Sequence, residues 1–396
     1  MKQKVCMLLS YLPFLDARLF ECEAKSLVKY GYDVTIIAPR KNGFLYDIDG
    51  KPFIKQFSEQ TFFFEGIKVV TYDMENRTEN ALTDPLFRLG LEEGADYYHA
   101  HELNSFYFGK EIKLALKKNG KGAKLIYDSR QLAPDPFSVT LREEDKQKWR
   151  EMLLDSLKEA DYTIAVSDSI KAWYLAMDPM FPVEVIYNCP PLASNYQIKG
   201  QQDGKFVAAH EGNASGAVLQ KFYSITDLVQ KEVDFHFKII GGPRFGENVV
   251  VPEQVKNQII RTGWVHYHSL PTLLSDVDIG LIDIDPTNSL NNSFAMPSKL
   301  FSYLNNGVPV ITNKCSEVEK IINTYQCGLV LNKLNPTPKD YAEGLLFLNQ
   351  NRSMLEQMSM NARRAVEEFY NWDNMEKRLI SIFQSLESKQ TSYLLS

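Results

Sequence analysis

Apolar runs of strand length alternate with segments of helical period along the first half of the chain. The earliest unit predicts a strand at residues 4–12, a helix at 17–31 and a second strand at 32–39. The helix has one apolar face, formed by Leu19, Cys22, Ala24, Leu27 and Val28. The same alternation recurs in the runs ADYYHA, KLIYD, DYTIAVS and VEVIYN, and it predicts a parallel sheet covered by helices.

The pattern stops at residues 188–205, where proline, glycine and polar residues replace the apolar runs. A stretch of this composition is typical of a linker between domains. A second α/β series then follows, with the runs FVAAHEGN, FHFKIIGG, VDIGLID, VPVIT and CGLVL. The chain therefore predicts an α/β fold with two Rossmann-like domains facing across a cleft. Ligands of such sheets bind beyond the carboxyl ends of the strands.

Composition narrows the class of protein. The 396 residues are 44% hydrophobic and 24% charged, so ordinary buried cores are expected. The net charge is −6 and the pI is about 5.7. No segment is basic enough to form the phosphate-neutralising surface that nucleic-acid binding requires, so no nucleic-acid partner is expected.

Five cysteines are spread through the chain without a C-x-x-C pair, which favours reduced thiols over a disulfide framework. The apolar run near the N-terminus is interrupted by Pro13, Asp16 and Arg18, and no small-residue cleavage site follows it. No stretch is long and apolar enough to span a bilayer. These observations favour a cytoplasmic location.

The segment FAMPSKLFSYLNNGVPVI at residues 294–311 predicts a short helix with a free N-terminus. Pro297 suits the first helical position, and Gly307 suits the left-handed residue that ends a helix. Taken alone, such a start is more often only a capped core helix. Because it follows a loop that leaves the strand DIGLID, its N-terminus is expected to face the cleft. There the amides of Ser298 and Lys299 would bind phosphate.

The same segment resembles the pattern P-x-K-L-F-E-Y-L-x-x-G-x-P-V-I of bacterial GT-B glycosyltransferases of the family 4 group. LDARLFECEAKSLVKYGYDVTIIAP is similar to the first βαβ unit of that group, with its D-x-R and G-[YH]-x-V elements. Further similar segments are YYHAHELN, KLIYDS, DYTIAVSDSIK, VIYNCPP and FYNWDNMEKRLISIFQSL. The resemblance thus touches most of the chain.

The resemblance implies a retaining glycosyltransferase that needs no metal. Such an enzyme moves a sugar from a nucleotide-sugar donor to a saccharide or lipid-linked saccharide, here in the synthesis of a surface polysaccharide or glycoconjugate. It also implies an acceptor domain at residues 1–190, a donor domain at 191–370, and a final helix at about 371–396 that packs back on the first domain. Negative charge gathers on the departing diphosphate, so dipoles and cations should point at it.

In the first domain, the resemblance places His101 against the transferred sugar, although a histidine that merely closes a strand is the simpler alternative. Asp16 and Arg18 match the D-x-R loop on the acceptor side, and Asp16 also suits a helix cap. His101 and Asp16 are the catalytic candidates. In YDSRQLAPD, Arg130 stands on the acceptor side where the group more often has a histidine, which leaves the identity of the acceptor open.

In the second domain, the two glutamates of the group's E-x(7)-E arrangement correspond to Phe294 and Ser302, so a weaker hydroxyl replaces the ribose-binding carboxylate. The expected contacts to the donor diphosphate are Pro297, Ser298, Lys299, Arg244, Lys221 and Gly212. The expected contacts to the donor sugar and ribose are Ser302, Glu211 and Asn292. As alternatives, the cations are solvated surface residues and Glu211 binds a backbone amide.

Two His-x-His pairs raise the alternative of a metalloenzyme. His99 and His101 point the same way if YYHAH is a strand, as metal ligands do, and His266 and His268 repeat the spacing. No acidic or cysteine cluster joins either pair in an obvious pattern along the chain. No metal or other cofactor is therefore expected.

Lys110, Lys113 and Lys117 share one face of a predicted helix. Such a face is usually only solvated. It would also attract anionic lipid beside a lipid-linked acceptor, with about 1 kcal/mol per residue near the surface. Peripheral contact with the inner face of a membrane is thus a possible partner interaction.

Two functions of other kinds compete with the transferase. A non-catalytic homologue, acting as a partner or saccharide-binding subunit, is favoured by the missing glutamates. A sugar-nucleotide epimerase on the same fold would convert one nucleotide sugar into another without an acceptor.

Overall fold

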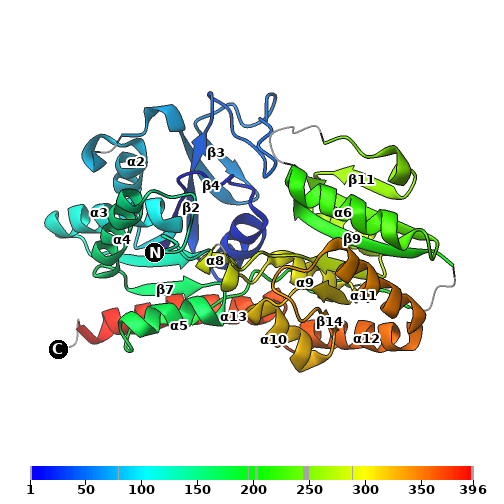
Figure 1. The fold of residues 1–396 in the computed structure, drawn as a ribbon. Helices are drawn as coiled ribbons and strands as arrows, with labels where there is room; N and C mark the ends of the chain where they lie inside the picture. Colours follow the sequence, from blue (N-terminus) through cyan, green and yellow to red (C-terminus); the bar gives the residue numbers. More distant parts are fainter. Residues whose placement is uncertain are drawn as a thin grey trace. The chain divides into compact units, whose positions relative to one another are not determined.

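The computed structural model describes residues 2–78, 80–194, 196–200, 204–243, 249–287 and 289–393, with side chains up to residue 388. The chain divides into two compact units (Figure 1). Unit 1 consists of Met1–Tyr187 together with Met375–Ser396, and unit 2 is Asn188–Asn374.

The described residues of unit 1 form one sheet of eight strands in the order β3-β4-β2-β1-β5-β6-β7-β8. The strands are β1 Lys4–Leu8, β2 Asp33–Arg40, β3 Thr61–Phe64, β4 Ile67–Asp73, β5 Tyr97–His101, β6 Lys124–Ser129, β7 Tyr162–Ala165 and β8 Val183–Val185. Only β3 is antiparallel to its neighbour within this described sheet. The central strands are buried almost throughout, as expected for a parallel sheet with helices on both faces.

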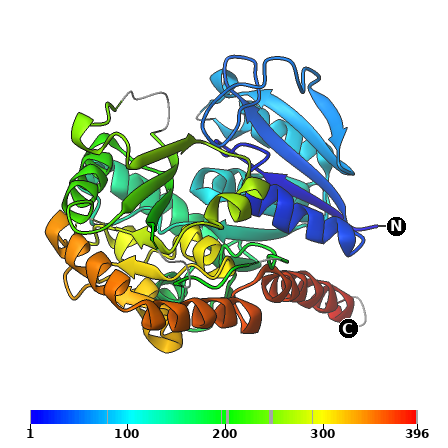
Figure 2. The same cartoon turned by 90° about the vertical axis from the view of Figure 1, so that its right-hand side faces the viewer.

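Helices connect these strands. They are the π-helix η1 Ala17–Ala24, α1 Lys25–Lys29, the 3₁₀ turns η2 Met74–Asn76 and η3 Ala81–Thr83, α2 Pro85–Glu93, α3 Glu102–Lys118, α4 Glu143–Leu157 and α5 Asp168–Met177. The last helix, α13 Trp372–Tyr393, joins unit 1 from Met375 onward. Figure 2 shows α13 as the red helix at the C-terminal end of the chain. The centre of its Phe383 ring lies 5.3 Å from that of Tyr32 and 5.2 Å from that of Tyr97.

The described part of unit 2 forms a six-stranded parallel sheet in the order β11-β10-β9-β12-β13-β14. The strands are β9 Phe206–Asn213, β10 Phe235–Gly242, β11 Ile259–Gly263, β12 Ile279–Ile282, β13 Val310–Thr312 and β14 Gly328–Val330. The helices are α6 Gly216–Val229, η5 Glu253–Val255, η6 Tyr267–Ser269, α7 Leu270–Leu274, α8 Leu290–Ser293, α9 Ser298–Asn305, α10 Ser316–Tyr325, α11 Pro338–Gln350 and α12 Arg352–Glu368. Its core includes Phe222 of α6 stacked on Phe237 of β10, with ring centres 4.8 Å apart.

The structure also bears on two expectations about the chain's environment. All five cysteines are buried free thiols, which agrees with the expected absence of a disulfide framework. Among the described helices, none combines the length and apolar character needed to cross a membrane.

Candidate functional site

Helix α9 at Ser298–Asn305 carries the anion-binding segment expected from the sequence. The sequence predicts Pro297 as the first helical residue, but Pro297 is extended, with φ −71° and ψ 136°, and is the N-cap instead. The Pro297 side chain has no atom that could cap this helix end by a hydrogen bond. The first-turn amides of Ser298 and Lys299 have no intrahelical acceptor because the helix begins there. Gly307 follows with φ 64°, which confirms the predicted left-handed end.

The carboxyl end of β9 lies against the first turn of α9. Lys299 Nζ lies 3.3 Å from His210 Nε2, and Ser302 Oγ donates a hydrogen bond to Glu211 Oε1 at 3.2 Å. Gly212 has φ 97°, and a Cβ atom at this position would lie 3.9 Å from Lys299 Nζ. Because glycine carries no side chain there, the space in front of the lysine stays open.

Burial changes the proton affinities of these groups. It lowers the pKa of Lys299 to about 8, although the negative charges of Glu211 and Asp283 oppose the change. It raises the pKa of Glu211 to about 7, against the opposing effects of Lys299 and Ser302. Burial and the Lys299 charge together hold the pKa of His210 well below its usual value. The first turn of α9 therefore presents the ammonium group of Lys299 beside the carboxyl group of Glu211 on β9, which readily takes a proton.

Lys221 extends from α6 and is already paired. Its Nζ lies 2.6 Å from Asp283 Oδ2 and 5.0 Å from the centre of the Tyr341 ring. The Tyr341 hydroxyl donates to the other oxygen of Asp283 at 2.7 Å. A diphosphate would have to compete with Asp283 for Lys221, so Lys299 is the stronger candidate for an anion contact.

Helix α8 carries Asn292, a predicted donor contact, and Phe294, which replaces an expected glutamate. Asn292 belongs to α8, and its Nδ2 donates to the carbonyl of Asp285 at 2.9 Å. Phe294 is the C-cap of α8, so an aromatic ring stands where the resemblance leads one to expect a glutamate. Arg244, the other predicted cation, lies outside the described residues.

In unit 1, Asp16 has two structural roles. Its Oδ1 accepts a hydrogen bond from the amide of Leu19 at 3.1 Å, which confirms the predicted cap of the following helix. It also binds the Arg130 guanidinium through both oxygens, at 3.0 and 3.1 Å. Asp16 therefore fixes the position of Arg130, a residue predicted for the acceptor side.

Arg18 lies in the interior of unit 1. Its Nε donates to Glu23 at 2.8 Å, and one terminal nitrogen donates to the Ile186 carbonyl at 2.8 Å. The other terminal nitrogen lies 3.2 Å from Asp128 Oδ2. The residue is only 2% exposed, so an acceptor could reach Arg18 only by displacing these partners.

Strand β5 places His99 and His101 on one side, with ring centres 4.5 Å apart. His101 Nδ1 lies 3.4 Å from Asp128 Oδ2, and its Nε2 lies 3.7 Å from Glu23 Oε2. No acidic cluster joins this pair in an obvious pattern along the chain, but the fold brings two carboxyl groups to it, Glu23 from η1 and Asp128 from the adjacent strand β6. Both histidine rings are fully buried, and the predicted contact of His101 with a sugar stays a prediction.

The two carboxyl groups of this cluster differ in acidity. Burial raises the pKa of Glu23 to about 8, with an opposing effect from Arg18. Burial alone would also raise the pKa of Asp128, but the Arg18 charge and the neighbouring His101 ring hold it below its usual range. Burial lowers the pKa of His101. A proton in the cluster is thus held more readily by Glu23 than by Asp128.

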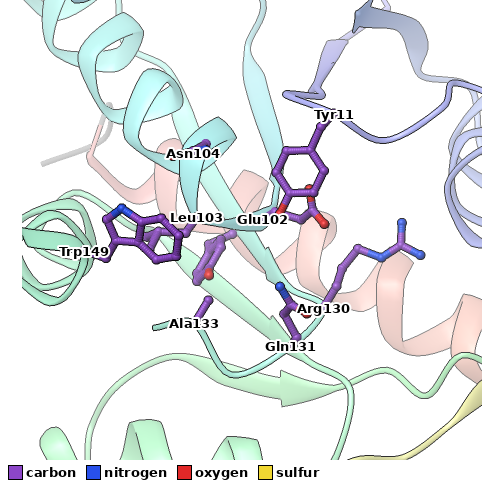
Figure 3. Close-up of a pocket in the computed structure, with 9 residues that line it drawn as sticks. Tyr11, Glu102, Leu103, Asn104, Arg130, Gln131, Ala133 and Trp149 are labelled. Carbon is purple, nitrogen blue, oxygen red and sulfur yellow. The ribbon is translucent and has the colours of Figure 1, made fainter. Parts of the chain in front are cut away.

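A pocket of 220 Å³ opens in unit 1 beside this cluster. Its lining residues come from four segments (Figure 3): Tyr11, Glu102, Leu103, Asn104, Tyr127, Arg130, Gln131, Ala133 and Trp149. Glu102 has φ 70°, a conformation that is rare for a residue other than glycine and that often marks a functional position. Burial raises its pKa to about 7. Aromatic walls with a few polar groups are typical of small-molecule sites.

The predicted lysine face on α3 is mostly neutralised. Lys110 Nζ lies 2.7 Å from Glu111 and 2.7 Å from Asp155. Lys113 Nζ lies 2.7 Å from Asp161. Of the three lysines proposed for membrane contact, Lys110 and Lys113 therefore hold acidic partners, and the contact itself stays a prediction.

Comparison with known proteins bears on both units. Residues 209–351 match the family described as "Glycosyl transferases group 1". A search of curated protein sequences finds no significant match. Among solved structures, sucrose-phosphate synthase from Thermosynechococcus elongatus has a TM-score of 0.71 at 11% identity, covering 98% of this chain and 100% of that one.

Two further structures are similar over almost the whole chain. Anabaena Alr3699/HepE in complex with UDP-glucose has a TM-score of 0.69 at 14% identity, covering 96% of this chain and 99% of that one. The lipopolysaccharide outer core galactosyltransferase WaaB has a TM-score of 0.60 at 13% identity, covering 97% and 99%. At such identities the likeness shows the fold, which is the GT-B combination of two Rossmann-like domains. The family match covers residues 209–351, which lie in unit 2, so it places this part of the chain among the group 1 glycosyltransferases.

Proposed function

We propose that this glycosyltransferase moves a sugar, with retention of configuration, from a nucleotide-sugar donor to a hydroxyl group of a saccharide or lipid-linked saccharide. The observation that carries the proposal is the free N-terminus of α9, with Lys299 beside Gly212 and the Glu211–Ser302 pair next to it. Similar structures contain UDP or UDP-glucose, which supports a nucleoside diphosphate as the donor's leaving group.

The proposed chemistry explains why charge is needed at this helix end. The bond between the anomeric carbon and the diphosphate oxygen breaks, and the acceptor oxygen bonds to the same face of that carbon. The acceptor's hydroxyl proton leaves with the diphosphate. Negative charge gathers on the diphosphate as the bond breaks, and fixed dipoles and cations lower the barrier by stabilising it. The dipole of α9 supplies typically about 0.3–1 kcal/mol and Lys299 supplies a full charge, so the proposal needs no metal at the diphosphate.

Glu211 and Ser302 are assigned to the hydroxyl groups of the donor's ribose or sugar. Ser302 holds Glu211 Oε1, while Glu211 Oε2 has no hydrogen-bond partner within the described part of the chain. A buried carboxyl oxygen without a partner is available to a ligand hydroxyl. Asn292 is kept as a secondary candidate because its side chain amide already binds its own loop.

The pocket in unit 1 is assigned to the acceptor. Arg130 and Glu102 give it polar groups, and Trp149 gives it an aromatic wall. Asp16 acts there as a positioning residue, because it reaches the pocket through its ion pair with Arg130. Such a site suits a hydroxylated ligand with an apolar ring face.

Isothermal titration calorimetry with UDP, GDP and ADP, followed by mass spectrometry of the matching nucleotide sugars, tests the proposal. We expect saturable binding of one nucleoside diphosphate and slow release of free sugar from its sugar conjugate. Failure to bind any of them refutes the donor assignment. Binding without sugar release indicates the non-catalytic homologue, and an altered nucleotide sugar without acceptor indicates an epimerase.

A further inference from the structure

The buried cluster around β5 has the residue types and spacing of a metal site. Glu23, His99, His101 and Asp128 each offer one ligand atom, and these atoms lie within 4.8 Å of one another. All four residues have no measurable exposure to solvent. Two strands and a helix bring them together, since β5 is paired with β6 and Glu23 extends from the π-helix η1. Local π-helical geometry is often found at functional sites.

The hydrogen bonding of the cluster is incomplete. Six of its atoms lack a hydrogen-bond partner within the described residues: Glu23 Oε2, both ring nitrogens of His99, both ring nitrogens of His101, and Asp128 Oδ2. Roughly nine in ten buried polar atoms in folded proteins have a partner, so six exceptions in one place need an explanation. A bound cation satisfies several such atoms at once.

The distances leave room for an ion. Glu23 Oε2 lies 3.7 Å from His101 Nε2 and 4.0 Å from His99 Nε2. An ion with tetrahedral ligands at about 2.0–2.1 Å holds those ligands about 3.4 Å apart. The three atoms are therefore too far apart for good hydrogen bonds with one another, and small side-chain movements bring them to coordination distance.

The charge of the surroundings favours a cation. Arg18 and Arg130 face the carboxyl groups of Glu23, Asp128 and Asp16. A bound cation replaces the proton that Glu23 holds, and the three carboxylates then exceed the two guanidinium groups by one negative charge. Arg18 binds Oε1 of Glu23 and so leaves Oε2 for another partner.

We propose that Glu23 Oε2, His99 Nε2 and His101 Nε2 bind one divalent transition-metal ion, of which zinc is the best match. Two imidazoles and one carboxylate are a ligand set that zinc accepts, whereas calcium and magnesium take oxygen ligands. The ring of His101 gives only one nitrogen to the ion. Its Nδ1 faces Asp128 at 3.4 Å, and this carboxylate orients the ring as the second carboxylate of a carboxylate–histidine–metal triad does.

The ion acts within unit 1 and is separate from the donor diphosphate assigned to unit 2. It ties η1 to β5, and through Asp128 it ties both to β6. With Nε2 on the ion and Nδ1 at Asp128, His101 has no ring nitrogen left for the transferred sugar, so this inference competes with the predicted His101–sugar contact. It is independent of the diphosphate assignment in unit 2.

Metal content of the full-length protein tests the site. The chain is produced with zinc in the medium, washed in its native state with a chelator that removes surface ions, and measured by inductively coupled plasma mass spectrometry. Because the ligands are fully buried, we expect about one zinc ion per chain to survive the wash and to be lost when the chelator is present during unfolding. A washed native chain without metal overturns the proposal.

Three variants locate the ion. Glu23→Gln keeps the size of the side chain and an oxygen for Arg18, and we expect zinc content to fall below about a tenth of the original. Asp128→Asn is expected to lower zinc affinity by about 10- to 100-fold in competition with a chromophoric chelator. His268→Gln is the matched control, because it removes a histidine from the other His-x-His pair, whose rings lie 5.1 Å apart. It should leave zinc content unchanged.

A measurement on the unaltered chain covers the case in which the buried variants do not fold. In nitrogen-15 spectra of the histidine rings, zinc should shift the Nε2 signals of His99 and His101 and leave those of His266 and His268 in place. Unshifted His99 and His101 signals at full zinc loading overturn the assignment, as does undiminished zinc in a folded Glu23→Gln variant.

Discussion

Replacing Lys299 with methionine separates the ligand-binding role of this residue from any role in folding. Methionine has a similar length and packs well in partly buried positions, but it has no charge. The substitution removes the Nζ atom that lies 3.3 Å from His210 Nε2 and next to the open space at Gly212. We expect weaker binding of UDP without loss of the fold.

The magnitude follows from the contact that is lost. A hydrogen bond to a charged group contributes roughly 1.5–3 kcal/mol, which at about 1.4 kcal/mol per decade corresponds to a Kd for UDP higher by about one to two decades. The same substitution should not weaken the fold. Burial lowers the pKa of Lys299 from 10.5 to about 8, so keeping its charge in the fold costs up to about 3 kcal/mol, less where solvent screens it. The pKa of about 8 already includes the attraction to Glu211, so the free energy of unfolding should stay unchanged or rise in Lys299→Met.

Calorimetric titration with UDP and unfolding in urea measure the two quantities on the same preparations. Lys231→Met is the matched control, since Lys231 is an exposed lysine of unit 2 that pairs with Asp227 at 2.7 Å. An unchanged Kd in Lys299→Met refutes the diphosphate assignment. A similar loss of affinity in Lys231→Met, or a loss of several kcal/mol of stability in Lys299→Met, shows that the effect is not specific to the contact.

Three further predictions concern the same two units. UDP affinity should fall as pH rises through about 8, because the diphosphate is fully ionised above about pH 6 and binds the ammonium form of Lys299; a Kd that stays constant from about pH 7 to 9.5 contradicts this. The groups that face Lys299 are Glu211, His210 and Asp283. Gly212→Ala puts a methyl group toward Lys299 at a φ of 97°, so calorimetry should show UDP affinity reduced about tenfold and urea unfolding a stability loss of about 1 kcal/mol. Trp149→Ala should raise the KM for a saccharide acceptor by about tenfold or more while the Kd for UDP stays the same, and equal changes in both would remove the pocket from the acceptor side.

Elements with strong local signals were predictable from the sequence. DSIKAWYLAM coincides with α5, whose N-cap Ser167 accepts a hydrogen bond from Ile170, and FVAAHEGN coincides with β9. The hairpin of β3 and β4 was not predicted. Its turn is Glu65-Gly66, with φ values of 48° and 81°, and it lacks the Asn-Gly or Asp-Gly signal of this turn type.

The two candidate sites also differ in how far they could be predicted from the sequence. The end of α9 was predictable because its signals, Pro297 before the helix and Gly307 after it, lie within one short stretch of the chain. The cluster around His101 was not, because Glu23 and Asp128 come from distant segments. The helical pattern at residues 17–31 also predicts ordinary α-helical geometry, whereas η1 at Ala17–Ala24 is a π-helix with a different angle between successive side chains. Sequence spacing could therefore not show that Glu23 points at the histidines.

Phe294 and Ser302 stand where the resemblance leads one to expect glutamates, but the fold brings another carboxyl group to Ser302. Tyr303 ties α9 to β9, since its hydroxyl donates to the Ala209 carbonyl at 3.2 Å and accepts from the Glu211 amide at 2.8 Å. This contact brings the Glu211 side chain to Ser302, where the expected ribose-binding carboxylate is missing. A carboxyl group with a free oxygen thus occupies the region from a neighbouring strand. We therefore infer that Glu211 of β9 supplies the carboxyl group that Phe294 and Ser302 cannot, so the absence of the two glutamates does not by itself indicate that the donor site is lost.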